Sequence, residues 1–487
     1  MKISTIILVA GNNSRLHLDY PKCLYPIIRR PMLSYLLDSI YSFSTIVLVV
    51  KYKEDLFRDF VNNYDKNDNI SVVTQGENLG TFSAVYSGFT ACKESDIIVI
   101  VPGDKPLINK TILTGLIEKH TSTNVDMTLL TTYDRNNTEY LRIDQTNPTS
   151  LRNYSDLNIY EKLSLELYTS IICINKTTLL DVFCHQFDNS PLNNDLSIKD
   201  IVSFVLNKKY KVSTYYTKDA FMCYGVNNFY DLSMVENYLR METNKRHMQN
   251  GVCLINPETI TISNEVKIEN GVTIYPNTYI TGKTYIGKNS IIGPNTEIHN
   301  ANIGQDNIIK HSLIYDSKIG DNCKIGPFAH LRMNNILNNN IRIGNFVEIK
   351  SSTIGDNTKA SHLSYCGDST IGKNVNVGCG TITVNYDGKN KYQTKIGDNV
   401  FLGCNSNLIA PIIIEDNALI AAGSTIYENV PKNSLSIART YQINKEGYAL
   451  KYPHIKKHID WKVFSIICFS LYINYILLDE HSHIFSK

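Results

Sequence analysis

The sequence predicts two unlike halves, a layered α/β domain followed by a parallel β-helix. Short apolar runs alternate with helix-length segments up to about residue 228, whereas an aliphatic residue recurs at every sixth position in the second half. The chain has 487 residues, more than one typical domain needs. We expect an α/β domain at 1–228, a linking helix at 229–250, a β-helix at 251–447 and a tail at 448–487.

Composition restricts the partners and the compartment. The formal net charge is +2 and 43% of the residues are hydrophobic, so neither value singles out a nucleic acid or an acidic partner, and any partner must be argued from sites. The eleven cysteines lack paired CxxC spacing, and Met1–Ser4 lead into a strand-like run without a signal-peptide pattern. We therefore expect free thiols and a cytoplasmic location.

The C-terminal tail contains the only stretch that raises the question of a membrane. The apolar run Val463–Leu478 is shorter than the roughly 20 residues of a spanning helix, and Asn474 interrupts it. We predict a packed or poorly ordered tail rather than a membrane anchor.

The first half predicts a parallel sheet covered by helices on both faces, because strands alternate with helix-length segments. The expected strands are Thr5–Ala10, Thr45–Val50 and Ile97–Val101, and the expected helices are Met32–Ile40 and Thr81–Phe89. Ligands of such sheets bind at the carboxyl ends of the strands. Asp104, in "VPGDKPL" just after a strand, is therefore placed for a ligand.

The first strand leads into "LVAGNNSRLHLDYPK", from Leu8 to Lys22. A loop between a strand and a helix commonly binds phosphate, but such loops usually need several glycines and this one has only Gly11. The residues of the loop alone leave open whether it binds a nucleotide.

The second half predicts a β-helix with triangular coils. One aliphatic side chain in six points inward and stacks on the next coil, while glycine and asparagine occupy the corners. An amphipathic helix does not fit, because a six-residue period makes no single stripe on a helix of 3.6 residues per turn. The repeated positions are Ile262, Ile268, Ile274, Ile280, Ile286, Ile292, Ile298, and later Ile396, Leu402, Leu408, Ile414, Ile420 and Ile426.

Two interruptions of the repeat, Phe328–Asp368 and the loop Thr383–Thr394, are expected to carry the ligand sites. Arginine and lysine suit a phosphate, and a histidine can act as a general base near neutral pH. The basic residues could equally be solvated loop charges, and a lone histidine is more often structural. The candidates are Arg332, Glu348, Lys350, His362, Tyr365, Asn376, Asn385 and Lys391.

Several motifs in this half resemble those of one enzyme family. They are "IGPFAHLR", "IGNFVEIK", "ASHLSYCGD", "NVNVGCGTITVNYDGKNKYQT" and "IAAGSTI". The chain resembles the bifunctional bacterial enzyme of UDP-N-acetylglucosamine synthesis, in which N-acetylglucosamine-1-phosphate uridylyltransferase is joined to glucosamine-1-phosphate N-acetyltransferase. The resemblance implies a left-handed β-helix, a homotrimer with acetyltransferase sites between subunits, and small-molecule substrates.

The resemblance also implies roles for the candidate residues of the β-helix. His362 would take a proton from the glucosamine amine as it attacks acetyl-CoA, with Glu348 orienting the histidine or the amine. The residues that would bind the sugar phosphate are Arg332, Lys350, Tyr365, Asn376, Asn385, Tyr386 and Lys391.

Acetyl-CoA would be held around Cys379, Cys404, Ala422 and Arg439. The two cysteines replace the alanine and serine that the family usually has, and a thiol hydrogen-bonds weakly. We expect altered CoA affinity rather than its loss. The alternative is that these positions hold only small residues of the β-helix.

The first half resembles the Rossmann-like nucleotidyltransferase domain of the same family. The family loop L-x-x-G-x-G-T-R-M followed by P-K keeps Arg15 and Lys22 here, which would neutralise the UTP phosphates, while Asn13 replaces a glycine. Asp104 and Asn227 match the residues that hold the catalytic Mg²⁺. The UTP and UDP-sugar positions are Leu8, Gly11, Lys22, Gln75, Gly80, Thr81, Gly103 and Asn227.

The acceptor side of this domain departs from the family. Leu141 and Tyr168 replace a glycine and the sugar-binding asparagine, and they could fill the acceptor pocket. Glu166 matches the acid of the family's E-I-N-T-G segment. Three functions follow, in order: the bifunctional enzyme, an acetyltransferase with a weakened first domain, and a non-catalytic β-helix that binds sugar nucleotides. The intact surroundings of His362 argue against the third.

Overall fold

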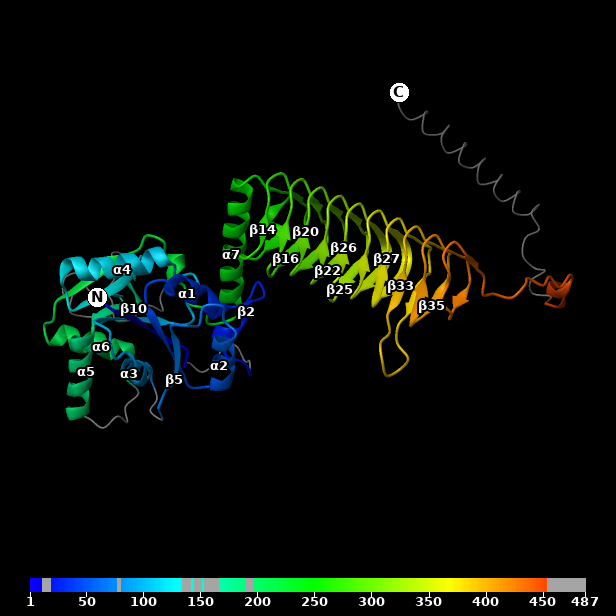
Figure 1. Cartoon of the computed structure of the whole chain (residues 1–487). Helices are drawn as coiled ribbons and strands as arrows, with labels where there is room; N and C mark the ends of the chain where they lie inside the picture. The colour runs from blue at the N-terminus through cyan, green and yellow to red at the C-terminus, as the bar shows by residue number, and fades with distance from the viewer. Residues whose placement is uncertain are drawn as a thin grey trace, which may run out of the picture.

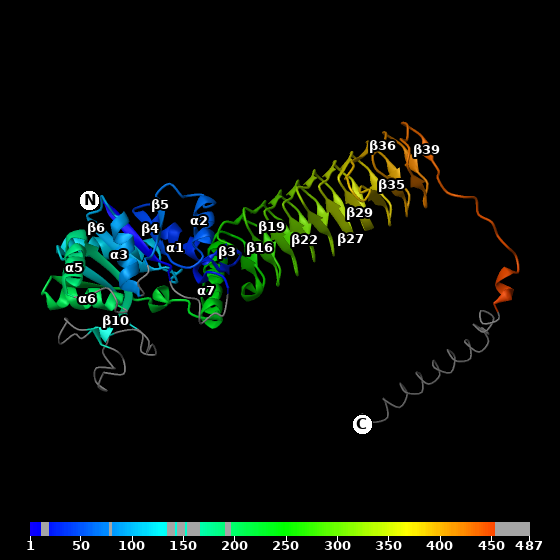
Figure 2. The ribbon, with the colours of Figure 1, turned by 90° about the horizontal axis from the view of Figure 1, so that it is seen from below.

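The computed structural model describes residues 1–10, 19–76, 80–133, 142–143, 151–152, 166–189 and 196–452. Within these ranges an α/β domain is joined through one long helix to a rod of stacked β-coils (Figure 1). Figure 2 shows the same rod from below, with its coils running away from the domain. The predicted fold class is confirmed, a Rossmann-like domain followed by a left-handed parallel β-helix.

The central sheet of the first domain has the strand order β11-β7-β10-β6-β1-β4-β5. The strands are β1 (Ile3–Leu8), β4 (Thr45–Val50), β5 (Ile70–Thr74), β6 (Ile97–Pro102), β7 (Met127–Thr132), β10 (Leu167–Asn175) and β11 (Val212–Tyr216), with β8 (Arg142–Ile143) and β9 (Leu151–Arg152) beside β10. β1 pairs in parallel with β4 and β6, whereas β10 runs antiparallel to β6 and β7. The prediction of an all-parallel sheet is therefore wrong at β10.

Helices cover both faces of the sheet, as predicted. They are α1 (Met32–Ile40), α2 (Glu54–Asn62), α3 (Thr81–Ala91), α4 (Lys110–Thr123), α5 (Lys176–Asn189) and α6 (Ile198–Asn207). Buried side chains of α1, α2 and α4 share one apolar core, and those of α3, α5 and α6 share the other. Because β1, β4 and β6 are parallel, their carboxyl ends at Leu8, Val50 and Pro102 meet at one edge of the sheet.

The long helix α7 (Phe229–Gln249) joins the two halves. Its N-terminus is closed by a capping box, in which Asn228 accepts from the Asp231 amide and Asp231 accepts from the Asn228 amide. Asn244 is buried and donates to the carbonyl oxygens of Pro257 and Ile260 at 2.9 and 2.8 Å. The helix is therefore anchored to the first coil of the rod by hydrogen bonds from within its last turns.

The rod consists of two sheets of short parallel strands. The larger sheet contains β12 (Cys253–Leu254), β13 (Thr261–Ile262), β15 (Thr273–Ile274), β16 (Tyr279–Thr281), β18 (Ile291–Ile292), β19 (Glu297–His299), β21 (Ile308–Ile309), β22 (Leu313–Tyr315), β24 (Lys324–Ile325), β25 (His330–Arg332), β27 (Arg342–Lys350), β29 (Lys359–Gly367), β31 (Asn376–Val377), β32 (Ile382–Val384), β34 (Phe401–Leu402), β35 (Asn407–Ile409), β37 (Leu419–Ile420), β38 (Thr425–Ile426) and β39 (Leu435–Ser436). The other contains β14 (Lys267–Ile268), β17 (Tyr285–Ile286), β20 (Asn302–Ile303), β23 (Lys318–Ile319), β26 (Ile336–Leu337), β28 (Thr353–Ile354), β30 (Ser369–Ile371), β33 (Thr394–Ile396) and β36 (Ile412–Ile414).

The repeated aliphatic side chains form the core of the rod. Ile262 pairs with Ile280, which pairs with Ile298 on the next coil, and all three are fully buried. Corner residues such as Asn277 and Asn295 have φ values of 57° and 49°, a left-handed conformation that asparagine tolerates. The hexapeptide interpretation is confirmed.

One of the two expected interruptions is absent. Across Phe328–Asp368 the coils continue without a break, and β27 and β29 run through a corner as long paired strands. The aliphatic pattern is obscured there because Ile349 and Ile354 are only five residues apart and the next inward side chain is the small Ala360. The other interruption is real: the loop between β32 and β33 leaves the rod and returns (Figure 1).

A hairpin of the first domain contacts the rod. β2 (Pro26–Ile27) and β3 (Arg30–Pro31) are joined by Ile28 and Arg29, whose φ values are 49° and 60°. Arg29 forms an ion pair with Glu297 and lies 5.5 Å from the ring centre of Tyr279. Arg30 lies 3.1 Å from Glu265. The hairpin tip thus connects the sheet domain to the first coils by charge pairs.

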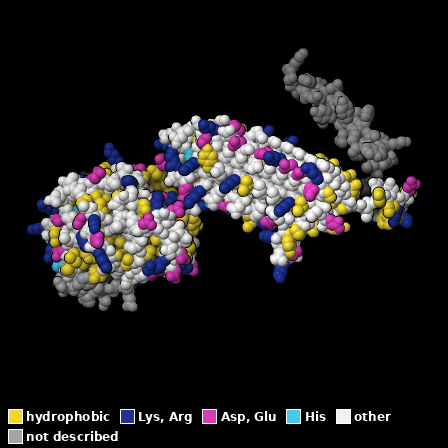
Figure 3. Space-filling model, in the orientation of Figure 1, with side chains coloured by type: hydrophobic (Ala, Val, Ile, Leu, Met, Phe, Trp, Pro, Cys, Tyr) yellow, Lys and Arg dark blue, Asp and Glu magenta, His cyan; other side chains and the backbone are white. Residues whose placement is uncertain are grey.

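Figure 3 shows basic and acidic side chains interspersed over the visible face, without a large area of one sign. No helix among the described residues has the length and apolarity needed to cross a bilayer. The apolar run Val463–Leu478 lies outside the described residues.

Candidate active sites

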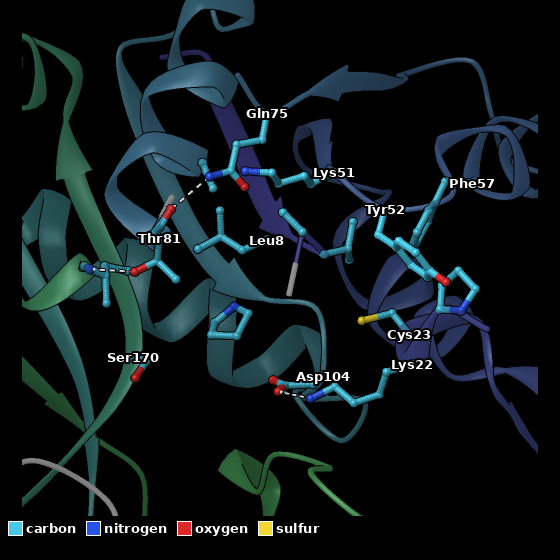
Figure 4. Close-up of a pocket in the computed structure, with 17 residues that line it drawn as sticks. Leu8, Lys22, Cys23, Lys51, Tyr52, Phe57, Gln75, Thr81, Asp104 and Ser170 are labelled. Atoms are coloured by element: carbon cyan, nitrogen blue, oxygen red, sulfur yellow. Dashed lines mark hydrogen bonds and ion pairs between the residues drawn. The ribbon is translucent and has the colours of Figure 1, made fainter. Parts of the chain in front are cut away.

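A cavity of about 810 Å³ opens at the carboxyl edge of the first domain's sheet (Figure 4). Its walls are mainly apolar, and a few polar side chains converge on it, as in many small-molecule sites. The lining residues are Leu8, Val9, Ala10, Pro21, Lys22, Cys23, Lys51, Tyr52, Phe57, Gln75, Gly80, Thr81, Ala84, Pro102, Asp104, Ser170 and Ile198.

Lys22 and Asp104 form an ion pair on one side of the cavity, with Nζ 2.8 Å from Oδ2 (Figure 4). Asp104 follows β6, and Gly103 lets that strand end approach β1, because a Cβ at Gly103 would lie 2.3 Å from a methyl carbon of Val9. Asp104 therefore lies where the strand pattern predicted. The pair places a cation and a carboxylate together at the carboxyl edge of the sheet.

The segment Gly225–Asn227 lies beside Asp104. The Val226 amide donates to the Asp104 carbonyl at 2.9 Å, and the Cα hydrogen position of Gly225 faces Asp104 Oδ1. One carboxylate and one amide suit Mg²⁺, which takes few protein ligands and completes its shell with phosphates and water. Among the described residues, no group of three His, Cys, Asp or Glu side chains could hold a metal alone.

Gln75, Gly80 and Thr81 lie together on the opposite side of the cavity. The Gln75 backbone amide donates to the Val50 carbonyl at 2.7 Å, and its side-chain Nε2 donates to the Gly80 carbonyl at 3.0 Å. Thr81 begins α3 and accepts from the Ile198 amide at 2.9 Å. These bonds fix the orientation of the Gln75 amide.

Several predicted positions of this domain lie outside the described residues, namely Gly11, Asn13, Arg15 and Leu141. Tyr168 is described, and its ring is not in the cavity. It is 1% exposed and packs in the apolar core with α3, α5 and α6. The expectation that Tyr168 fills the acceptor pocket is therefore wrong, because β10 turns this side chain to the inside of the domain.

The residues next to Tyr168 differ in their surroundings. Ser170, at a φ of 63° where the register of β10 shifts, lines the cavity (Figure 4). Glu166 accepts a hydrogen bond from the Thr131 hydroxyl of β7, so its carboxylate binds a neighbouring strand, and it is not among the residues that line the cavity.

The β-helix gathers its basic candidates on one face of neighbouring coils. Arg332, Lys350 and Gly367 are in register on β25, β27 and β29. Arg332 Nε lies 2.7 Å from Glu348 Oε1, and Lys350 Nζ lies 2.8 Å from Asp368 Oδ2. The structure thus brings two cations together, each with its own carboxylate.

Lys391, on the projecting loop, lies next to Lys350. The adjacent Lys350 ammonium lowers the pKa of Lys391. Burial acts to lower the pKa of Lys350, but the paired Asp368 outweighs it and the pKa of Lys350 is raised. Two ammonium groups so close together favour an anionic ligand, which would relieve their repulsion.

The polar candidates Tyr365 and Asn385 complete this cluster. Asn385 Nδ2 donates to Asp368 and lies 3.4 Å from the Tyr365 hydroxyl. The Tyr365 ring lies over Gly367, where a Cβ would come within 2.3 Å of the hydroxyl oxygen. Tyr386 forms an isolated bridge with Lys391 in the loop. The cluster is thus walled by a ring on one side and the loop on the other.

His362 lies at an exposed corner of the rod, where β27 and β29 pair. Its Nδ1 lies 3.0 Å from the Asn345 side-chain oxygen, which leaves Nε2 directed away from that contact. A histidine held at Nδ1 can present Nε2 as the base. Asn376 is paired with Lys359 and Phe401, and among the described residues no hydrogen bond joins it to the cation cluster.

The four expected CoA positions form a column on successive coils. The Asn405 amide donates to the Cys379 carbonyl at 2.7 Å, which sets Cys379 above Cys404. A Cβ at Gly403 would lie 2.5 Å from the Ala422 amide nitrogen, and one at Gly423 would lie 3.9 Å from Arg439 Cδ. The structure therefore brings all four positions to one corner.

Sequence reasoning missed three residues of these sites: Lys51, Asn345 and Asp368. Lys51 directly follows β4, so the strand-end rule that found Asp104 could have found it as well. Asn345 and Asp368 lie one coil from His362 and Lys350, and that spacing is the signal that could have found them.

Comparison with known proteins finds matches in both halves of the chain. Residues 5–155 match the MobA-like NTP transferase domain, 261–343 the GMPPB C-terminal domain, and 393–428 the bacterial transferase hexapeptide repeat. Bifunctional protein GlmU from Acholeplasma laidlawii is 43% identical over 455 residues, which cover 92% of this chain and 97% of that protein. The chain belongs to the GlmU family.

Other GlmU proteins show the same extent of similarity. The protein from a Geobacillus species is 38% identical over 92% of this chain and 98% of its own length, and that from Clostridioides difficile 37% over 93% and 98%. GlmU relatives thus cover the sheet domain and the rod together. Membership in the family confirms the prediction of a bifunctional transferase with uridylyltransferase and acetyltransferase activities.

Proposed function

We propose that the two transfers are divided between the sheet domain, 1–228, and the rod, 251–447, with 229–250 as the joining helix. The rod would acetylate glucosamine-1-phosphate with acetyl-CoA. The sheet domain would then transfer uridylyl from UTP to N-acetylglucosamine-1-phosphate and release pyrophosphate. The observation that carries the assignment is that each half contains its own converging set of charged side chains, around Lys22 and around Lys350.

In the acetyl transfer, the sugar phosphate would bind Arg332, Lys350 and Lys391. His362 would accept a proton from the glucosamine amine as the nitrogen attacks the thioester carbonyl, and the C–S bond would then break while that proton passes to the sulfur, which releases CoA as its thiol. The adjacent ammonium groups of Lys350 and Lys391 support this placement of the dianionic phosphate. Tyr365, Asn385 and Tyr386 would contact the sugar, and Asn376 and Glu348 remain assigned from the resemblance.

The acetyl donor would lie along the corner column of Cys379, Cys404, Ala422 and Arg439. This corner is formed by backbone and small side chains, which allows a thin pantetheine arm to approach closely. Arg439 is the cation of the column and suits the CoA phosphates.

In the uridylyl transfer, Lys22 and Arg15 would neutralise the UTP phosphates, and Asp104 and Asn227 would hold Mg²⁺. When bound, Mg²⁺ supplies charge neutralisation and orientation at the phosphates. Lys22 orients the Asp104 carboxylate through their ion pair.

We also propose a cytoplasmic homotrimer that binds no nucleic acid and no membrane. Phe328, Phe346 and Leu363 are more than half exposed at the corner next to His362, and the two phenylalanine rings stack at 5.4 Å. An exposed apolar corner of this kind suits burial against another subunit.

Two coupled assays test the proposal. Purified full-length chain should release thiol from acetyl-CoA with glucosamine-1-phosphate, and pyrophosphate from UTP with N-acetylglucosamine-1-phosphate and Mg²⁺. His362→Ala should abolish only the first reaction and Lys22→Met only the second, so each variant is the folding control of the other. Thiol release without pyrophosphate release would leave an acetyltransferase alone.

A further inference from the structure

Lys51 is a polar residue of the nucleotide cavity that the proposed mechanism does not use. It directly follows β4, and its side chain extends along the cavity wall. Figure 4 shows Lys51 and Gln75 pointing toward one another, on the side of the cavity opposite the Lys22–Asp104 pair. Lys51 therefore lies at the end of the cavity away from the phosphate-directed charges.

The orientation of Gln75 gives this pair a defined hydrogen-bonding pattern. Gln75 is 7% exposed, and its Nε2 is used by the Gly80 carbonyl at 3.0 Å. Its Oε1 is thus turned to the other side, toward the Lys51 ammonium (Figure 4). An ammonium can only donate and a carboxamide oxygen can only accept. The two side chains together present a donor next to an acceptor.

A pyrimidine base can be distinguished by that pattern. Uracil presents a carbonyl acceptor, O4, next to the N3–H donor, whereas cytosine presents an amino donor, N4, next to the N3 acceptor. A lysine donor beside a glutamine acceptor matches the uracil edge. The same pair opposes the cytosine edge, with donor against donor and acceptor against acceptor.

We propose that Lys51 is a specificity-determining residue that, with Gln75, selects uracil over cytosine in the nucleoside triphosphate. The proposal rests on the proposed assignment of the uridylyl transfer to this cavity. Lys51 donates to O4 of the base and holds the Gln75 amide with its oxygen toward N3–H. The lysine would thus act on the choice of base, not on the phosphate chemistry.

The test compares UTP and CTP as substrates of the full-length chain and of Lys51→Met, by pyrophosphate release with N-acetylglucosamine-1-phosphate and Mg²⁺. The ratio of kcat/KM for UTP to that for CTP should fall about tenfold in the variant, since one hydrogen bond to the base is lost. Lys51→Arg keeps a donor and should retain most of the ratio. Lys93→Met, an exposed lysine beyond the far end of α3, should leave it unchanged.

An unchanged UTP/CTP ratio in Lys51→Met would overturn the proposal, including the case in which both nucleotides lose activity equally because the lysine contacts phosphate. Thiol release from acetyl-CoA reports folding of every variant.

Equilibrium titration with UTP and CTP separates this proposal from the assignment of the transfer itself. If the wild-type chain prefers UTP in binding but does not release pyrophosphate, the uridylyl assignment fails while Lys51 is still tested by whether its variant loses that preference. A wild-type chain that binds UTP and CTP equally would refute the role of Lys51.

Discussion

Lys350 and Asp368 form a bidentate ion pair in the wall of the rod, with the lysine Nζ 2.8 and 3.0 Å from the two carboxylate oxygens. The Lys350 side chain is only 6% exposed, and Asn385 also donates to Asp368. The aspartate therefore fixes one cation and one amide of the proposed sugar-phosphate site at once.

Replacing Asp368 by asparagine should raise the KM for glucosamine-1-phosphate about tenfold or more, because Lys350 loses its counter-ion and a single amide oxygen must then serve both Lys350 and Asn385. Thiol-release kinetics would measure this KM. Asp316→Asn is a matched control, since Asp316 and Asp368 both occupy corners of the rod with left-handed φ values of 45° and 46°, which asparagine tolerates. Equal KM values in the two variants would contradict the positioning role of Asp368.

The contact between Asn345 and His362 predicts a shift in the pH profile of acetyl transfer. Asn345→Asp places a carboxylate 3.0 Å from Nδ1 in the present geometry, and its charge should stabilise the protonated imidazole. The base then stays protonated to higher pH, so the acidic limb of kcat/KM for acetyl transfer moves upward. A profile that coincides with the wild type would show that His362 is not the titrating base.

The buried hydroxyl of Tyr168 lowers the stability of the sheet domain. Its hydroxyl has no hydrogen-bond partner among the described residues, although the side chain is only 1% exposed. Tyr168→Phe should raise the free energy of unfolding by about 1 kcal/mol, since an unsatisfied buried hydroxyl is removed. Denaturant unfolding measures this value, and the KM for N-acetylglucosamine-1-phosphate should not change. Destabilisation by Tyr168→Phe would indicate a partner for the hydroxyl.

His247 predicts a loss of stability in mild acid. Burial, assisted by the neighbouring Arg246, lowers the pKa of His247 from 6.5 to about 4. Between these values the unfolded chain holds the proton and the folded chain does not, so stability is full above pH 6.5 and falls toward pH 4. The slope should be about 1.4 kcal/mol for each pH unit. His247→Gln should flatten it, as followed by denaturant midpoints between pH 7 and 5.

The two halves differ in how well the sequence predicts them. In the rod, the core position is set by a strict period, so Ile262, Ile280 and their successors could be placed without a structure. The period fails where a corner loses one residue, as between Ile349 and Ile354, and where the loop between β32 and β33 leaves the rod. In the sheet domain, an apolar run such as Leu167–Asn175 indicates a strand but not its direction, which depends on pairing with distant β6 and β7.

The residues of the candidate sites also differ in whether a local sequence pattern can predict them. Asp104 and Lys350 were predicted because strand ends and family motifs mark them. Asp368 and Asn345 act through partners one coil away, and Tyr168 faces the core because of a register shift in β10. These three depend on three-dimensional neighbours that no local pattern shows.

The hairpin contact bears on how the chain can be divided. Arg29 and Arg30 are paired with Glu297 and Glu265, which belong to the first coils of the rod. A fragment that stopped after α7 would keep both arginines but lose both carboxylates, and its hairpin tip would hold left-handed Ile28 and Arg29 without external support. Exposed ion pairs contribute only about 0–1 kcal/mol each, and Arg30 would keep its ion pair with Asp38 at 2.7 Å inside the sheet domain. The two pairs therefore hold the hairpin against the first coils of the rod, and their loss would release the hairpin tip without removing the apolar core on which the sheet domain folds.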